Sequence, residues 1–209
     1  MNKKKLILFD VDGVILDSKS NMNFAWKAVQ DAFSINTTFK EYFENIGRPF
    51  SEIMKILGHS DKSDVIEKVY KNASLKNFSN IKFYSGTKSS LKSLLKDGYK
   101  LGVVTSKDKE RTEFVLEKLG VDFSVIRTPD NICRGKPSPD HLLYAMAVSN
   151  IDPSDTVFIG DMDVDYMAAI NAGIDYIHAE WGYSPNINYD VPKLKSFPDI
   201  VRYLKSENI

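Results

Sequence analysis

Short apolar runs that recur along the chain, separated by helical patterns, are the feature that most constrains its fold. The clearest run covers residues 5–9, and later runs cover 101–105, 156–160 and 174–178, with a weaker one at 123–127. Each run is continuous and does not alternate with polar residues, as expected for a strand that is buried on both faces. These runs therefore predict the strands of a parallel sheet.

The segments between the runs have helical periodicity and recognisable ends. The patterns at 88–97, 110–119 and 163–172 are each followed by a glycine, and two more helices are expected at 139–149 and after Pro198. Strands and helices that alternate in this way predict an α/β fold with helices on both faces of the sheet. We expect a doubly wound, Rossmann-like parallel sheet.

One long stretch, residues 18–82, interrupts the alternation. It contains no convincing buried strand, and its apolar residues recur at steps of three and four, as in amphipathic helices. The three helical patterns cover residues 22–33, 50–57 and 65–70. We therefore expect an inserted α-helical cap subdomain at 18–82 beside a core domain made of 1–17 and 83–209.

The composition excludes several classes of function. The chain has 209 residues, which suits one domain or one domain with an inserted subdomain. Lys plus Arg and Asp plus Glu both number 28, so a nucleic-acid binder that acts through bulk positive charge is excluded. The single cysteine, Cys133, excludes an internal disulfide and a multi-cysteine zinc site. The three histidines, His59, His141 and His178, do not have the sequence spacing of metal ligands.

The hydropathy of the chain bears on its location. No apolar stretch approaches the length of about 18 residues that a membrane-spanning helix needs. The first residues include too few apolar side chains for a signal peptide. We expect a protein without membrane contacts in a reducing compartment, the cytoplasm.

Acidic and hydroxyl side chains end or directly follow three of the apolar runs. They are Asp10, Asp12, Thr105, Ser106, Asp161, Asp163 and Asp165. Since the carboxyl ends of parallel strands form the ligand-binding edge of such sheets, we expect these side chains to meet there. Crowded carboxylates need a cation, and oxygen-only ligands favour Mg²⁺. Together with Lys136, the group predicts a site for a phosphoryl group, whose transfer depends on positioning and charge neutralisation.

Four motifs in the expected order resemble those of the haloacid dehalogenase superfamily. They are Asp-Val-Asp-Gly-Val at 10–14, Val-Val-Thr-Ser at 103–106, Lys-Pro-Ser-Pro-Asp at 136–140 and Gly-Asp-Met-Asp-Val-Asp at 160–165. Segments 168–173 and 181–183 look like the phosphoglycolate phosphatase branch, in which a helical cap follows the first motif. The resemblance covers nearly the whole chain.

The resemblance implies a role for each motif residue. Asp10 is the expected nucleophile that forms an aspartyl-phosphate, and Asp12 is the expected general acid and base. Mg²⁺ is expected to bind Asp10, the backbone carbonyl of Asp12, and Asp161. The expected phosphate-binding residues are Thr105, Ser106 and Lys136. Asp165 is expected to orient Lys136 or a metal-bound water, Asp163 to cap a helix and face solvent, and Arg48 in the cap to contact the substrate.

The resulting hypothesis is a magnesium-dependent phosphatase, a monomer or homodimer, that acts on a small phosphorylated metabolite. Phosphoglycolate is the first candidate, and a sugar phosphate, a nucleoside monophosphate or pyrophosphate also remain open. One alternative is a phosphomutase of the β-phosphoglucomutase kind, which shares the expected intermediate. A second is a non-enzymatic receiver-type module, which Asp12 and the inserted helices disfavour. Asp12 also disfavours dehalogenation.

Overall fold

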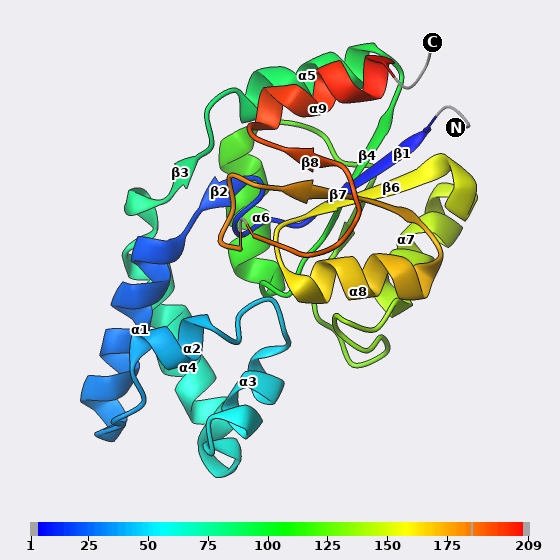
Figure 1. The fold of residues 1–209 in the computed structure, drawn as a ribbon. Helices are drawn as coiled ribbons and strands as arrows, with labels where there is room; N and C mark the ends of the chain where they lie inside the picture. The colour runs from blue at the N-terminus through cyan, green and yellow to red at the C-terminus, as the bar shows by residue number, and fades with distance from the viewer. Residues whose placement is uncertain (1–3, 185, 207–209) are drawn as a thin grey trace.

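Six parallel strands form the main sheet of the computed structural model, which describes residues 4–184 and 186–206 (Figure 1). The strands are β1 (Leu6–Phe9), β4 (Lys100–Val104), β5 (Val125–Arg127), β6 (Thr156–Gly160), β7 (Asp175–Ala179) and β8 (Lys193–Leu194). Their order across the sheet is β5-β4-β1-β6-β7-β8. The predicted doubly wound α/β fold is confirmed. The two-residue strand β8 was not predicted, because so short a segment has no apolar run.

Helices cover both faces of this sheet. On one face lie α5 (Thr87–Lys96), α6 (Lys109–Leu119) and α9 (Phe197–Ser206), and on the other lie α7 (Asp140–Ser149) and α8 (Asp163–Ala172). Each face has its own cluster of buried apolar side chains, since alternate residues of β1 point to opposite sides. Ile7 and Phe9 belong to the first cluster, whereas Leu6 and Leu8 belong to the second.

The central strand β1 fixes where polar side chains meet. All four residues of β1 are fully buried, and Phe9 is paired with Val103 of β4 on one side and Ile159 of β6 on the other. The three strands therefore end at nearly the same level. The residues that follow them are brought to one edge of the sheet.

A second group of helices lies beside the sheet, between β1 and α5 in the sequence. It comprises α1 (Lys19–Phe33), α2 (Phe39–Phe43), α3 (Phe50–Ile56), α4 (Ser63–Lys76) and the short 3₁₀ segments Ser60–Lys62 and Phe78–Asn80. The chain enters this group through β2 (Leu16–Asp17) and leaves through β3 (Lys82–Phe83), and these two strands pair with each other in antiparallel fashion. The short elements α2, β2 and β3 were not predicted.

This group of helices has a hydrophobic cluster of its own. Trp26 of α1 is fully buried and stacks on Tyr42 of α2 with ring centroids 4.4 Å apart. Met54 and Ile66 are buried in the same cluster. The division into a core at 1–17 and 83–209 and a cap at 18–82 stays a prediction, and its residues 1–3, 185 and 207–209 lie outside the described part of the chain.

The helical group contacts the sheet edge through hydrogen bonds and packed aromatic rings. The Ser106 hydroxyl donates a hydrogen bond to the backbone carbonyl of Gly47 at 2.6 Å. The ring of Phe43 packs edge-on against Tyr183, with centroids 5.2 Å apart. Among the described residues, no helix is both long and apolar enough to cross a bilayer.

Candidate active site

Three buried carboxylates and a lysine meet at the carboxyl end of β1 and β6. Asp10, Asp161 and Asp165 each place one carboxylate oxygen within 4.8 Å of those of the other two. The ammonium of Lys136 lies 3.0 Å from Asp10 Oδ1 and 2.6 Å from Asp165 Oδ1. The structure thus brings together four of the predicted site residues, which lie far apart in the sequence.

The turn after β1 can come this close to Asp161 only because residue 13 is glycine. Gly13 has a φ of +87°, a conformation that L side chains rarely adopt. A Cβ at this position would lie 2.2 Å from Asp161 Oδ2. The glycine of the Asp-Val-Asp-Gly motif is therefore required by the packing of the site itself.

Asp165 is held by the start of α8. Its Oδ2 accepts backbone N–H hydrogen bonds from Asp161 at 3.2 Å and Met162 at 3.0 Å, while its Oδ1 faces Lys136. The prediction that Asp163 caps this helix is wrong, because Met162 occupies the cap position and Asp163 is the first helical residue. Asp163 is exposed, as expected, and accepts a hydrogen bond from the Tyr189 hydroxyl at 2.7 Å.

Asp12 lies beside a second lysine that the sequence analysis missed. The Lys107 ammonium is 2.9 Å from Asp12 Oδ2, and the Ser18 hydroxyl donates to Asp12 Oδ1 at 2.5 Å. Only 2% of the Lys107 side chain is exposed, so this ion pair is shielded from solvent. The sequence did offer one indication that Lys107 belongs to the site, because it directly follows the Thr-Ser pair that ends the second motif.

The predicted phosphate-binding hydroxyls lie at the same edge. Thr105 is buried, and its Oγ1 accepts the backbone N–H of Lys107 at 3.2 Å. The Ser106 hydroxyl donates instead to Gly47 in the helical group. The side chain of Ser106 thus connects the two parts of the molecule.

A cavity of about 420 Å³ opens in front of these residues. Its wall includes Asp10, Asp12 and Thr105 from the sheet edge, and Arg48 from the helical group. The Arg48 guanidinium pairs with Glu52 at 2.9 Å. Arg48 therefore lines the same cavity as the predicted nucleophile, Asp10.

Burial and charge shift the pKa values of the cluster in opposite directions. Burial, reinforced by repulsion from Asp165 and Asp12 and opposed by Lys136, raises the pKa of Asp10 to about 6. Burial, with repulsion from Asp165 and Asp10, raises the pKa of Asp161 well above its usual value. Burial lowers the pKa of Lys136, but attraction to Asp10 and Asp165 outweighs burial and the net pKa is raised. Lys136 thus stays charged among the carboxylates that surround it.

The acidic cluster has the properties of a site for a hard divalent cation. Asp161 is fully buried, and among the described residues its Oδ1 has no hydrogen-bond partner. A buried carboxylate oxygen without a partner is costly unless a cation binds it. Because the donor set consists of carboxylate oxygens, it suits Mg²⁺ better than zinc or copper.

Burial also lowers the pKa of Lys107, and attraction to Asp12 offsets this only in part. Two ammonium groups thus contact the two aspartates of the first motif: Lys107 pairs with Asp12 and Lys136 with Asp10. An anion that enters the cavity would meet Asp10 close to both ammonium groups. Such an arrangement can bind a phosphoryl group and present a carboxylate oxygen to it.

Known proteins resemble the chain in sequence and in fold. It is 30% identical to a phosphoglycolate phosphatase of Psychrobacter arcticus, with 96% of both chains covered. It is 27% identical to the pyrophosphatase PpaX of Bacillus velezensis, with 84% of this chain and 82% of the relative covered. The crystal structure of a hydrolase from Pseudomonas syringae superposes with a TM-score of 0.85 at 22% identity, covering 97% of this chain and 99% of that one.

A family model supports the same assignment. The model of haloacid dehalogenase-like hydrolases matches residues 7–179, a range that contains all four predicted motifs. The predicted resemblance is thereby confirmed: the chain belongs to the family of haloacid dehalogenase-like hydrolases.

Proposed function

We propose that this hydrolase is a Mg²⁺-dependent phosphatase that cleaves a small phosphorylated metabolite through an aspartyl-phosphate. The observation that carries the proposal is the position of Asp10, which lines a 420 Å³ cavity and pairs with Lys136 beside the unpartnered oxygen of Asp161. A nucleophilic carboxylate, a fixed ammonium and a cation site at one point match the needs of phosphoryl transfer.

Asp10 acts as the nucleophile in this proposal. One of its carboxylate oxygens forms a bond to phosphorus as the bond from phosphorus to the leaving oxygen breaks. Lys136, held between Asp10 and Asp165, neutralises charge as it builds up. Thr105, in the same wall of the cavity, is placed to bind a phosphate oxygen.

Asp12 moves the proton. It donates a proton to the departing alcohol oxygen, and later accepts one from the water that attacks the aspartyl-phosphate and releases inorganic phosphate. Lys107 and Ser18 each hold one oxygen of the Asp12 carboxylate, so both orient it without being consumed. We assign them as positioning residues.

Mg²⁺ would be held by Asp10, Asp161 and the backbone carbonyl of Asp12. Once bound, it would supply charge neutralisation for the phosphoryl oxygens. The fit rests on the oxygen-only donor set and on the buried, unpartnered Asp161 Oδ1. Asp165 would orient Lys136 through one carboxylate oxygen and the backbone of Asp161 through the other.

Residues 18–82 act as a cap over the site in this proposal. The cap places Arg48 in the wall of the cavity, and the carbonyl of Gly47 in the cap accepts a hydrogen bond from the Ser106 hydroxyl of the core. Closure of such a cap excludes bulk water and supplies contacts that select the substrate. Phosphoglycolate and pyrophosphate are the first candidates, because relatives of similar length carry those names. A cytoplasmic location remains part of the proposal.

Release of inorganic phosphate tests the function. Purified protein with Mg²⁺ is mixed with phosphoglycolate, pyrophosphate or p-nitrophenyl phosphate, and phosphate is measured over time. We expect EDTA to stop the release and Mg²⁺ to restore it, and Asp10→Asn to abolish turnover. The alternative phosphomutase would move the phosphoryl group between hydroxyls of a sugar phosphate without releasing phosphate. Full activity of Asp10→Asn would refute the proposal.

A further inference from the structure

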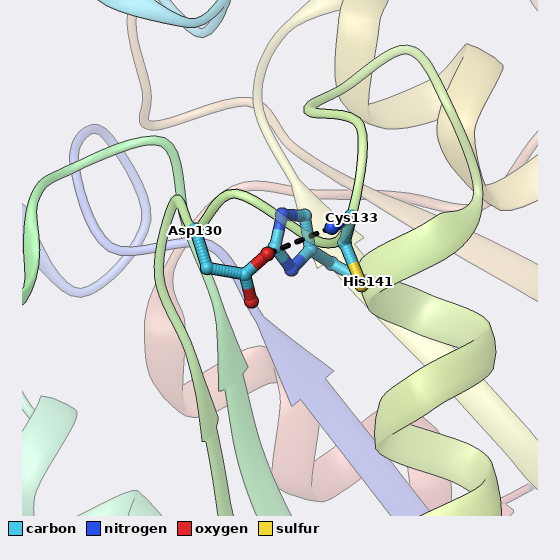
Figure 2. Close-up of side chains that lie close together, drawn as sticks. All are labelled: Asp130, Cys133 and His141. Carbon is cyan, nitrogen blue, oxygen red and sulfur yellow. Dashed lines mark hydrogen bonds between the residues drawn. The ribbon is translucent and has the colours of Figure 1, made fainter.

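A second group of possible metal ligands lies apart from the acidic cluster, at the loop between β5 and α7. Asp130, Cys133 and His141 each place one ligand atom within 4.8 Å of those of the other two (Figure 2). Asp130 and Cys133 belong to the loop, and His141 is the second residue of α7. The sequence analysis found no metal-ligand spacing around His141, because the loop folds back to bring these residues together.

The imidazole of His141 indicates that the group has a ligand to receive. His141 is 4% exposed, and among the described residues its Nδ1 has no hydrogen-bond partner. Figure 2 shows the ring beside the hydrogen bond that joins Asp130 to the backbone of Cys133. A buried ring nitrogen without a partner is costly, so its presence in a cluster of metal-binding side chains calls for an explanation.

The other two side chains are already oriented. Asp130 Oδ1 accepts backbone N–H hydrogen bonds from Ile132 at 2.8 Å and Cys133 at 2.7 Å, and Arg127 pairs with Oδ2. The same guanidinium lies 3.7 Å from Cys133 Sγ. A carboxylate has about four lone-pair sites, so Asp130 keeps capacity for a metal while these contacts hold it in place.

We propose that Asp130, Cys133 and His141 bind a borderline transition-metal ion, with Zn²⁺ as the expected occupant. Sulfur, imidazole nitrogen and carboxylate oxygen are the ligands that zinc takes, whereas Mg²⁺ prefers oxygen alone. In a tetrahedral site with metal–ligand distances of about 2.0–2.3 Å the ligand atoms lie roughly 3.3–3.8 Å apart. From their outer limit of 4.8 Å, the three atoms therefore need to approach one another by at most about 1.0–1.5 Å.

The proposed zinc site faces the same cavity as Asp10. All three ligand residues line the cavity wall, so the fourth coordination position is open to water or to an anionic ligand in the cavity. The ligands also flank Lys136, since two precede it and one follows it in the sequence. A metal ion bound here would connect both ends of the segment that carries the lysine.

Cobalt is the probe, because Co²⁺ occupies zinc sites and absorbs light when a thiolate binds it. Full-length protein, stripped of metal and saturated with Mg²⁺ to fill the acidic cluster, is titrated with Co²⁺ under reducing conditions. We expect one equivalent to give a sulfur-to-cobalt absorption band that Zn²⁺ removes. Cys133→Ser should abolish the band, and His141→Gln and Asp130→Asn should each lower Co²⁺ affinity at least about tenfold.

Two controls separate this site from the rest of the molecule. His59→Gln changes a histidine in the helical group and should leave Co²⁺ binding unchanged. Asp10→Asn, which the proposed function expects to be inactive, should keep the band, so failure of either proposal can be recognised on its own. Absence of the band, or a band of unchanged affinity in correctly folded His141→Gln, would overturn the zinc proposal.

Discussion

At the residue scale, the acidic cluster stabilises the folded chain poorly when no metal is bound. Asp161 is fully buried beside Asp10 and Asp165, and in the described part of the chain Lys136 is the cation that pairs with this group. Folding must therefore bring carboxylates together that repel each other and that lose their hydration. The carboxylates that suit metal binding therefore lower the stability of the metal-free fold.

Asp161→Asn should stabilise the metal-free protein. In the wild type, the Tyr183 N–H donates to Asp161 Oδ2 at 2.7 Å. The substitution removes the buried negative charge but keeps a side-chain oxygen that can accept this hydrogen bond. We expect the free energy of unfolding in EDTA at pH 8 to rise by about 1–3 kcal/mol, the cost of an unsatisfied buried polar group. Chemical denaturation measures the gain, and Asp122→Asn on the surface serves as the matched control.

The same variant has a signature in its pH dependence. Burial raises the pKa of Asp10 to about 6 and holds that of Asp161 well above its usual value. A raised carboxyl pKa contributes stability that is present below the unfolded-state value of about 4 and lost as pH rises through the folded-state value. Metal-free wild type should therefore be more stable at pH 5 than at pH 8, and the gain from Asp161→Asn should shrink at pH 5. An equal gain at both pH values would contradict this assignment.

Lys107→Met should slow catalysis through Asp12. The buried ammonium of Lys107 is the cation that contacts Asp12, so its loss frees one oxygen of the proposed acid and base. We expect kcat to fall at least about tenfold, within the range that general acid–base catalysis contributes, and the pH profile of kcat to shift. Lys107→Arg should recover part of the loss.

A second lysine of the cavity wall provides the control for Lys107. Lys71 pairs with Glu67 at 2.8 Å, and about a third of its side chain is exposed. Lys71→Met should leave kcat within about twofold, because exposed ion pairs contribute little. Steady-state kinetics on both variants compare them, and equal losses of kcat would argue against a special role for Lys107.

Single residues of the site differ in how well the sequence predicts them. Asp10 and Asp161 stand directly after apolar runs, and the level at which parallel strands end brings them together without detailed packing. The contact of Lys107 with Asp12, and that of His141 with Asp130 and Cys133, depend on the tertiary path of the loops that carry these residues. No periodicity in the sequence encodes contacts of that kind, so they were missed.

At the element scale, strands buried on both faces were predictable and very short elements were not. β1 and β6 are continuous apolar runs, whereas β2, β3 and β8 have two residues each and show no pattern. The five-residue helix α2 did carry a signal, because Thr38 and Glu41 form a capping box in which each side chain bonds the other's backbone N–H. That spacing would have identified the helix.

The loop before Lys136 packs closely against the residue that precedes α3, and a methyl group added at Gly135 tests this contact. A Cβ on Gly135 would lie 2.4 Å from Cγ and 3.1 Å from Cδ of Pro49, which directly precedes α3. Gly135→Ala should push the proposed cap away from the core. We expect KM to rise several-fold while the thermal unfolding temperature stays nearly unchanged, because the contact lies between two separately packed clusters.

A second substitution provides the control for Gly135→Ala. Pro49→Ala removes both ring atoms that the new methyl group would meet, so the double variant should recover the wild-type KM. Kinetics on the single and double variants form a double-mutant cycle whose coupling reports this contact alone. Additive effects on KM would show that the loop, and not the cap, responds to the added methyl group.

At the scale of the whole molecule, zero net charge coexists with a cavity whose wall is strongly charged. Long-range steering of an anionic substrate is therefore weak, and local groups must select it. A volume of about 420 Å³ lies near the lower end of the range for small-molecule sites. In the proposed function, part of that space holds the phosphoryl group and its cation, which leaves little for the rest of the substrate.

Substrate size should therefore govern the rate. We expect kcat/KM to be highest for phosphoglycolate or pyrophosphate and to fall at least about tenfold for a nucleoside monophosphate, since closure of the cap over a large leaving group is incomplete. Phosphate release from a graded series of phosphoesters measures the dependence. Gly135→Ala should reduce the ratio of kcat/KM between small substrates and the nucleoside monophosphate, because a displaced cap discriminates less by size. A nucleotide as the best substrate of the wild type would refute the size argument and leave the assignment of Asp10 untouched.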